Sequence, residues 1–297
     1  MQAAKTRYVE IACKSVLNRV RGMPFEWSIN PYRGCAHRCV FCYARRTHTF
    51  YDLDGRDDWG STIFVKLNAA EVVRRELASP SWSGCEVAIG TATDPYQAAE
   101  ARYGITRAIL IELARARTPA HLITRSPSIV RDVDVLQRLA RAGGISVCFS
   151  LPTLDADLAR AVEPTVAPPA QRLAALRRLA SAGIRTGVAI APVLPYLSDG
   201  VEQLRAVYAA AAEAGASFAW TSVLNLGEVA RDSYAAFLRE AHPELGERYA
   251  ALYRGRYASA AYAREVEARA RVARRGIAFE PPEGIVAQPA RLQLSLL

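Results

Sequence analysis

Three cysteines lie close together in the segment Cys35-Ala-His-Arg-Cys39-Val-Phe-Cys42, with the spacing C-x3-C-x2-C and with Tyr43 directly after the last one. Three thiolates in one short loop can hold three corners of a [4Fe-4S] cube and leave the fourth iron without a protein ligand. Clusters that only carry electrons are normally closed by four cysteines. The spacing therefore predicts a cluster with one iron left open for another ligand.

Two other uses of these cysteines, a zinc site and a disulfide framework, fit the sequence less well. A structural zinc site needs a fourth ligand, usually from a second Cys/His pair further along the chain. No second C-x2-C occurs, and His37 and His48 are the only nearby imidazoles. Cys13, Cys85 and Cys148 are scattered singly, which is unlike a disulfide framework. A non-catalytic nucleic-acid-binding protein, stapled by zinc or by an Fe-S cluster, is the alternative to an enzyme.

The composition sets broad limits on partners and location. A chain of 297 residues with 51% apolar residues can fill a large core. The net charge of +9 comes mainly from arginine and allows a nucleic-acid partner without requiring one. No stretch approaches the ~20 apolar residues of a membrane span, and the first residues lack the pattern of a secretory signal. Free thiols and an oxygen-sensitive cluster fit a reducing compartment, so we expect a cytoplasmic protein.

Short β-like runs alternate with helical runs through most of the chain. Strands are expected at 25–30, 63–66, 86–90, 121–124, 145–150, 185–191 and 218–224. Helices are expected from Asn68, where Glu71 suggests a capping box, and at 105–116, 132–141, 155–162, 169–182 and 200–214. This alternation implies parallel βα units. About six units are present, fewer than the eight of a closed barrel, so the sequence predicts an α/β fold with a partial (βα)6 TIM-like barrel.

The pattern also suggests how the chain is divided. We expect an N-terminal extension at 1–24, the partial-barrel core at 25–226, and an α-helical C-terminal region at 227–297 that packs on the core. The C-terminal helices, at 231–240, 243–254 and 258–274, are rich in arginine. They form either a side layer with solvated basic faces or a substrate-facing basic surface, for which Arg254, Arg256 and Tyr257 are the candidates.

Longer phrases match one branch of a known superfamily. They are Asn30-Pro31-Tyr32-Arg33-Gly34-Cys35, Thr47-His48, Gly90-Thr91-Ala92-Thr93-Asp94-Pro95-Tyr96-Gln97, Thr124-Arg125-Ser126-Pro127, Ser150-Leu151-Pro152-Thr153-Leu154-Asp155, Glu163-Pro164 and Ala191-Pro192-Val193-Leu194-Pro195. With the cysteine spacing, they make the chain resemble the radical S-adenosylmethionine (SAM) superfamily, and within it the spore photoproduct lyase-like, or DNA repair photolyase, branch. The likeness spans about residues 13 to 224.

The resemblance implies a function and a set of cofactor contacts. Enzymes of this kind use a [4Fe-4S] cluster and an electron from flavodoxin or ferredoxin to cleave SAM to methionine and a 5′-deoxyadenosyl radical, which abstracts hydrogen from a substrate. Cys35, Cys39 and Cys42 would hold the cluster. The residues that by position would contact SAM are Tyr43, Thr93, Asp94, Arg125, Ser150 and Ala191. Arg125 stands where relatives often have lysine, and it keeps a cation for the SAM carboxylate but with a planar fork.

One departure from the branch limits the prediction. In the lyase that repairs spore thymine dimers, a cysteine at the position of Thr91 donates a hydrogen atom to the product radical, and a hydroxyl O–H is too strong to do so readily. Cys85 lies before Thr91 on the same predicted strand and Cys148 lies within another, and both are expected to be core thiols. The sequence therefore predicts radical formation on an unassigned substrate, with nucleic acid as one candidate. A cluster enzyme that transfers the aminocarboxypropyl group of SAM is a further alternative.

Overall fold

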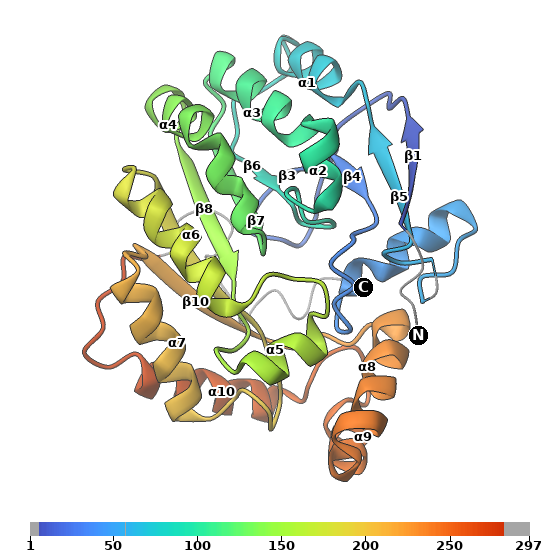
Figure 1. The fold of residues 1–297 in the computed structure, drawn as a ribbon, viewed down its shortest axis with the longest axis vertical. Helices are drawn as coiled ribbons and strands as arrows, with labels where there is room; N and C mark the ends of the chain where they lie inside the picture. The colour runs from blue at the N-terminus through green and yellow to red at the C-terminus, as the bar shows by residue number, and fades with distance from the viewer. Residues whose placement is uncertain (1–5, 57, 282–297) are drawn as a thin grey trace.

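The computed structural model describes residues 6–56 and 58–281, and six parallel strands form its central sheet (Figure 1). They are β3 (Trp27–Ile29), β6 (Val87–Ile89), β7 (Ala120–Thr124), β8 (Ile145–Ser150), β9 (Arg185–Val193) and β10 (Phe218–Val223). The strand order is β10-β9-β8-β7-β6-β3-β2, and β2 (Leu17–Arg19) pairs antiparallel with β3 at one edge. Because β10 and β2 are separate edges, the sheet does not close. The predicted partial barrel is confirmed.

The sequence of the strands explains why they lie in the interior. β8 reads Ile-Ser-Val-Cys-Phe-Ser, and all six of its residues are buried. Strands covered on both faces read as nearly continuous apolar runs with branched side chains. In the curved sheet, Ala88, Cys148, Ala189 and Phe218 pack together as one cluster, separate from the larger core beneath the helices.

A second, smaller sheet was not predicted. It has the order β1-β5-β4 and consists of β1 (Arg7–Ile11), β4 (Tyr32–Arg33) and β5 (Thr62–Lys66). The strand predicted at 63–66 therefore exists, but it lies outside the parallel sheet. β1 pairs with it in parallel and β4 antiparallel. This sheet supports the cysteine segment, which begins directly after β4.

Helices connect the parallel strands and follow the outside of the sheet, as Figure 1 shows. They are α1 (Ala69–Leu77), α2 (Ala98–Tyr103), α3 (Ile105–Arg115), α4 (Val133–Ala142), α5 (Ala156–Val162), α6 (Pro169–Ser181) and α7 (Val201–Glu213). α6 begins with proline at its first position, where no backbone N–H is needed, and Gly183 follows its end with φ +76°.

The capping box predicted for α1 is wrong. Asn68 does precede the helix, but its side chain makes no cap hydrogen bond. Instead, Asn68 Oδ1 accepts from the Cys13 amide at 2.8 Å and Asn68 Nδ2 donates to the Cys13 carbonyl at 3.0 Å. A tertiary contact with the first residues of the chain has replaced the local one. α2 is a further difference, since no helix was expected between the strand at 86–90 and the helix at 105–116.

Up to residue 281, where the described part of the chain ends, three α-helices follow β10: α8 (Glu228–Ala241), α9 (Gly246–Leu252) and α10 (Ala260–Ala273). α10 packs against α7 and β10, and α8 packs against the 3-10 segment Tyr43–Tyr51 that follows the cysteines. Two tyrosines, in α9 and directly after it, connect this helical region to the ends of β9 and β10. The Tyr249 hydroxyl donates to the Pro195 carbonyl at 2.6 Å, and the Tyr253 hydroxyl donates to the Leu224 carbonyl at 2.8 Å. Within the described ranges, none of the helices has the length and apolar character that a membrane span requires.

Candidate functional site

The three closely spaced cysteines occupy a loop between β4 and the 3-10 segment Tyr43–Tyr51. All three are free thiols; Cys35 and Cys39 are buried and Cys42 is partly exposed. The Cys42 amide donates to the Cys39 carbonyl at 3.2 Å, which folds the loop into a tight turn. Burial raises the pKa of both Cys39 and Cys42, and the charge of neighbouring Cys35 raises each of them further. The loop therefore brings three free thiols together, two of them buried.

The donor set fits an iron-sulfur cluster better than a single metal ion. Among residues 6–56 and 58–281, no three His, Cys, Asp or Glu side chains converge as the ligands of one ion do. The two nearby imidazoles have other contacts: His37 Nδ1 lies 3.3 Å from Asp94 Oδ2, and His48 Nε2 lies 3.1 Å from the Thr62 carbonyl oxygen. A cube of iron and sulfide takes one thiolate at each of three separate irons, and three cysteines in one short loop supply that number of thiolates.

Gly34 explains the local shape of the loop just before the first cysteine. Its φ is +80°, a conformation that side chains disfavour. A Cβ at this position would lie 2.6 Å from the Thr62 carbonyl oxygen and 2.8 Å from His48 Cε1. The buried His48 ring is in turn held edge-on by Trp59, with ring centroids 5.1 Å apart. Only glycine lets the chain pass this close to β5.

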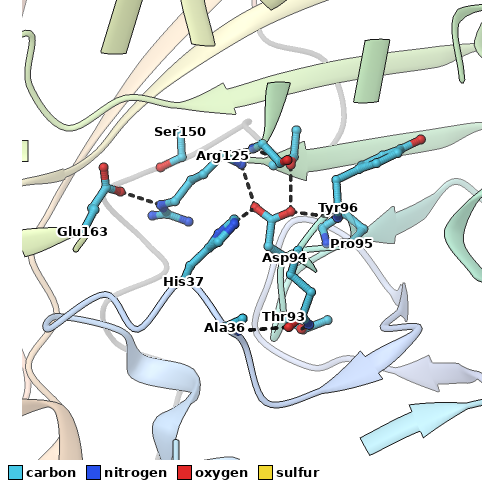
Figure 2. A network of polar contacts seen from close by, with 12 residues as sticks. Ala36, His37, Thr93, Asp94, Pro95, Tyr96, Arg125, Ser150 and Glu163 are labelled. Atoms are coloured by element: carbon cyan, nitrogen blue, oxygen red, sulfur yellow. Dashed lines mark hydrogen bonds and ion pairs between the residues drawn. The ribbon is translucent and has the colours of Figure 1, made fainter. Parts of the chain in front are cut away.

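Asp94 joins three parts of the site, as Figure 2 shows. This buried carboxylate follows β6 and accepts from the Arg125 amide at 2.6 Å and from the Thr124 hydroxyl at 2.8 Å, both at the end of β7. On its other side lies His37 of the cysteine loop. Burial opposes charge on both groups, but their mutual attraction outweighs it: the pKa of Asp94 is lowered and that of His37 is raised. The pair is therefore an ion pair that ties the loop to two strand ends.

Arg125 reaches from the end of β7 toward the cysteines. Burial opposes its charge, but Cys39 and Glu163 outweigh that effect and raise the pKa of Arg125. Its Nε donates to Glu163 Oε1 at 2.7 Å, as Figure 2 shows, and its guanidinium lies 5.7 Å from the centroid of the Phe41 ring. The other oxygen of Glu163 accepts from the buried Arg172. Glu163 thus bridges two arginines, one of them at the cysteine loop.

The remaining predicted site residues lie around the same rim, with most of their polar groups already paired. The Ser150 hydroxyl, at the end of β8, donates to the Ala191 carbonyl at 2.8 Å, and an Arg125 Nη lies 3.5 Å from the same oxygen. The half-exposed Tyr43 donates its hydroxyl to the Thr91 carbonyl. The buried Thr93 hydroxyl donates to the Gly34 carbonyl at 2.6 Å. The structure therefore brings all the predicted residues to one edge of the sheet, beside the cysteine loop.

Three further residues belong to this network of ion pairs and hydrogen bonds, although the sequence did not indicate that they would. His37 was weighed only as a zinc ligand, although its place between Cys35 and Cys39 put it in the loop. Glu163 belonged to a matching phrase but had no assigned role. Arg172 had no signal at all, because an arginine in an amphipathic helix usually faces solvent, whereas here it is almost fully buried.

Two arginine-lined hollows lie over α8, beside the segment that follows the cysteines. One, of about 500 Å³, is lined by Arg56, Asp232, Ser233, Ala235, Ala236 and Arg239. The other, of about 320 Å³, is lined by Leu226, Gly227, Glu228, Arg231, Asp232, Gly255 and Arg256. Of the basic-surface candidates, Arg256 lines a hollow, while Tyr257 forms a β-bridge with Asn225.

Comparison with known proteins gives a consistent result. The family model described as the radical SAM superfamily matches residues 29–206. An uncharacterized protein of Mycobacterium tuberculosis is 40% identical over 248 residues, covering 82% of this chain and 73% of the relative. An uncharacterized protein of Methanocaldococcus jannaschii is 26% identical over 196 residues, covering 66% of this chain and 71% of the relative. The fold is similar to that of a spore photoproduct lyase mutant with bound AdoMet and dinucleoside spore photoproduct, with a TM-score of 0.70 and 15% identity over 90% of this chain and 78% of that one.

Proposed function

The chain belongs to the radical SAM superfamily, and from this premise we propose that it cleaves SAM reductively and uses the 5′-deoxyadenosyl radical to abstract hydrogen from a nucleic-acid substrate. The cofactors of the superfamily are a [4Fe-4S] cluster and SAM. Cys35, Cys39 and Cys42 are the residues that would hold the cluster, which supplies one electron and an open iron for SAM. The observation that carries the proposal is the position of these free thiols beside Arg125, Ser150 and Ala191 on one rim.

The chain's own residues would bind and orient SAM. The guanidinium of Arg125 offers a cation for the SAM carboxylate, and Glu163 fixes its Nε so that the outer nitrogens face the rim. Ser150, the Ala191 backbone and Tyr43 would border the adenosine. Asp94 and Thr93 would support the site without contacting SAM directly, since their polar atoms are bonded to the end of β7 and to the cysteine loop. Such a site orients the reactants and keeps water away from the radical.

Product formation must differ from that in spore photoproduct lyase. By the resemblance to this branch, Thr91 stands at the position of the lyase cysteine, and its hydroxyl oxygen accepts from Asn30 Nδ2 at 3.2 Å. Cys148 is fully buried in the sheet interior, and Cys85 lies before β6. We therefore propose the radical-generating half of the lyase reaction for this chain and no dimer repair.

Nucleic acid is the substrate class we favour because basic side chains gather beside the site. Arg56, Arg231, Arg239 and Arg256 line the hollows over α8, and α8 packs on the segment that follows Cys42. In that segment Phe50 is 69% exposed, which suits stacking with a base. Arginines that neutralise phosphates release counterions and make affinity depend on salt.

The substrate class can be tested by binding. Affinity for single-stranded oligonucleotides should fall with salt, and Arg256→Ala should reduce the slope of log K against log salt by about 1. Arg141→Ala changes an exposed arginine of α4, away from the hollows, and serves as the control. Flat, negligible affinity in the wild type, or equal slopes in the two variants, would argue for a small-molecule or peptide substrate.

The reaction type can be tested by the nucleoside product. Under anaerobic conditions with dithionite, the reconstituted protein should convert SAM to 5′-deoxyadenosine, and in the cytoplasm reduced flavodoxin or ferredoxin would replace dithionite. Methylthioadenosine as the product would indicate aminocarboxypropyl transfer instead. A colourless protein with one bound zinc would indicate a non-catalytic, metal-stapled protein.

A further inference from the structure

The side chain of Gln97 contacts the peptide groups on both sides of Cys35. Its Oε1 accepts from the Ala36 amide at 2.9 Å, and its Nε2 donates to the Gly34 carbonyl at 3.1 Å. The residue is 1% exposed and lies at the start of α2, where its side chain makes no cap hydrogen bond to the helix. All the hydrogen bonds of this carboxamide that the structure describes therefore go to the cysteine loop and to Thr93.

The partners define which end of the carboxamide is which. The Ala36 N–H can only donate, so the oxygen must face it. The Gly34 carbonyl can only accept, so the NH2 group must face that side. An apolar side chain of the same shape would leave the Ala36 N–H without this acceptor and would remove one of the donors to the Gly34 carbonyl, which is costly.

Thr93 completes the arrangement. Its hydroxyl accepts from Gln97 Nε2 at 2.8 Å and donates to the Gly34 carbonyl at 2.6 Å. The carbonyl oxygen of Gly34 thus accepts two hydrogen bonds, and the Thr93 hydroxyl donates its hydrogen bond to the cysteine loop. Two residues from the end of β6 and the start of α2 therefore fix the backbone around one cysteine.

We propose that Gln97, supported by Thr93, is a positioning residue for the first cluster ligand. It holds the conformation of Cys35 and directs the Ala36 N–H to its own oxygen, so that this amide does not donate to a thiolate or sulfide of the cluster. Hydrogen bonds to the sulfurs are one of the factors that set the potential of an Fe-S centre. The inference rests on the proposed function, because it assumes that Cys35 holds the cluster.

The test uses Gln97→Leu in the full-length reconstituted protein. Iron release to a chelator should be about 10-fold faster than in the wild type, the size typical of lost outer contacts at metal sites. In the cluster that remains, the midpoint potential, measured by EPR-monitored titration, should shift upward as the freed Ala36 amide reaches a sulfur. Gln137→Leu is the matched control, because Gln137 donates from α4 to the Ala182 carbonyl at 2.9 Å, away from the loop.

A second variant guards against simple misfolding. Gln97→Glu keeps an acceptor for Ala36 but cannot donate to Gly34 or Thr93, so it should also release iron faster than the wild type. Equal release rates and potentials in Gln97→Leu, Gln97→Glu and wild type would overturn the positioning role. Equal losses in the Gln137→Leu control would overturn it as well, since the effect would then be general destabilisation. A wild-type protein that takes up no cluster would instead contradict the proposed function.

Discussion

The two ends of the parallel strands use polar side chains in different ways. At the carboxyl ends, Asp94, Arg125 and Ser150 bond to residues from other strands and from the cysteine loop. At the amino ends, His121 Nδ1 meets Ser146 Oγ at 2.6 Å on the neighbouring strand, and Arg185 lies 4.6 Å over the Phe218 ring. The residues at the carboxyl ends bring together groups from several loops around one site, whereas those at the amino ends hold neighbouring strands together. This is the division seen in complete βα barrels, with chemistry at one end and stability at the other.

The largest effect should come from removing a cluster ligand. Cys39→Ala leaves two thiolates in the loop, too few for a stable cluster, so we expect loss of the brown colour and of 5′-deoxyadenosine formation. Visible absorption, iron analysis and the anaerobic SAM-cleavage assay measure these properties.

Cys148→Ala is the matched control for that experiment. Cys148 is also buried, but it lies within β8 and packs against Ala88, Ala189 and Phe218. We expect normal iron content and a modest loss of stability from the missing sulfur. If Cys148→Ala lost the cluster as completely as Cys39→Ala, the ligand assignment to the loop would be wrong.

The next effect concerns the carboxylate that bridges two arginines at the carboxyl ends. Glu163 and Arg172 are each 1% exposed at their side chains, and Glu163→Gln would leave Arg172 buried without a counter-charge. Removing one partner of a buried pair typically costs about 3–5 kcal/mol. Chemical denaturation of the variant and the wild type measures the free energy of unfolding. Asp157→Asn, which breaks the exposed pair with Arg160, should change it by less than about 1 kcal/mol.

Much of the fold could be predicted because its signals are local. β8 was predicted with its observed bounds, since a run of branched and apolar residues between two helical patterns has few other structures available. The strand at 63–66 was assigned to the wrong sheet for a physical reason. Its partner β1 lies more than 50 residues earlier, and a pattern of residues does not state which distant strand will pair with it.

The site shows the same limit. The cysteines are marked by their spacing, and Asp94 and Arg125 by phrases at strand ends. Gln97 belongs to the same phrase as Asp94 but was given no role, and Arg172 belongs to no phrase. The importance of both lies in backbone groups they reach across the fold. Asn68 shows the reverse case, in which a local capping signal lost to a tertiary contact with Cys13.

A smaller effect should appear at the amino ends of the strands when the pH falls. Burial, aided by the charge of Arg185, lowers the pKa of His121 to about 3. The folded protein therefore keeps His121 neutral where the unfolded chain binds a proton. Stability is fully present above pH 6.5 and falls below it, by at most about 1.4 kcal/mol per pH unit for one proton.

His121→Gln should remove most of this acid sensitivity and leave iron content at neutral pH unchanged. Urea unfolding at pH 7 and pH 5 compares the variant with the wild type, and His242→Gln is the control, because the His242 side chain is 30% exposed. An unchanged pH dependence in His121→Gln would mean that other groups cause the loss of stability at low pH. A loss of cluster in this variant would break the division between the two ends of the sheet.

The smallest effect tests that division with the same chemical change made at the other end. Glu280 lies 3.2 Å from Arg185, but its side chain is 63% exposed, unlike that of Glu163. Water screens such a pair, so Glu280→Gln should change the free energy of unfolding by less than about 1 kcal/mol. The backbone of Glu280 stays bound to the Ser217 carbonyl at 2.8 Å. Equal destabilisation of Glu163→Gln and Glu280→Gln in urea unfolding would contradict this expectation. Burial would then not explain why the ion pairs of Glu163 contribute more to stability than that of Glu280.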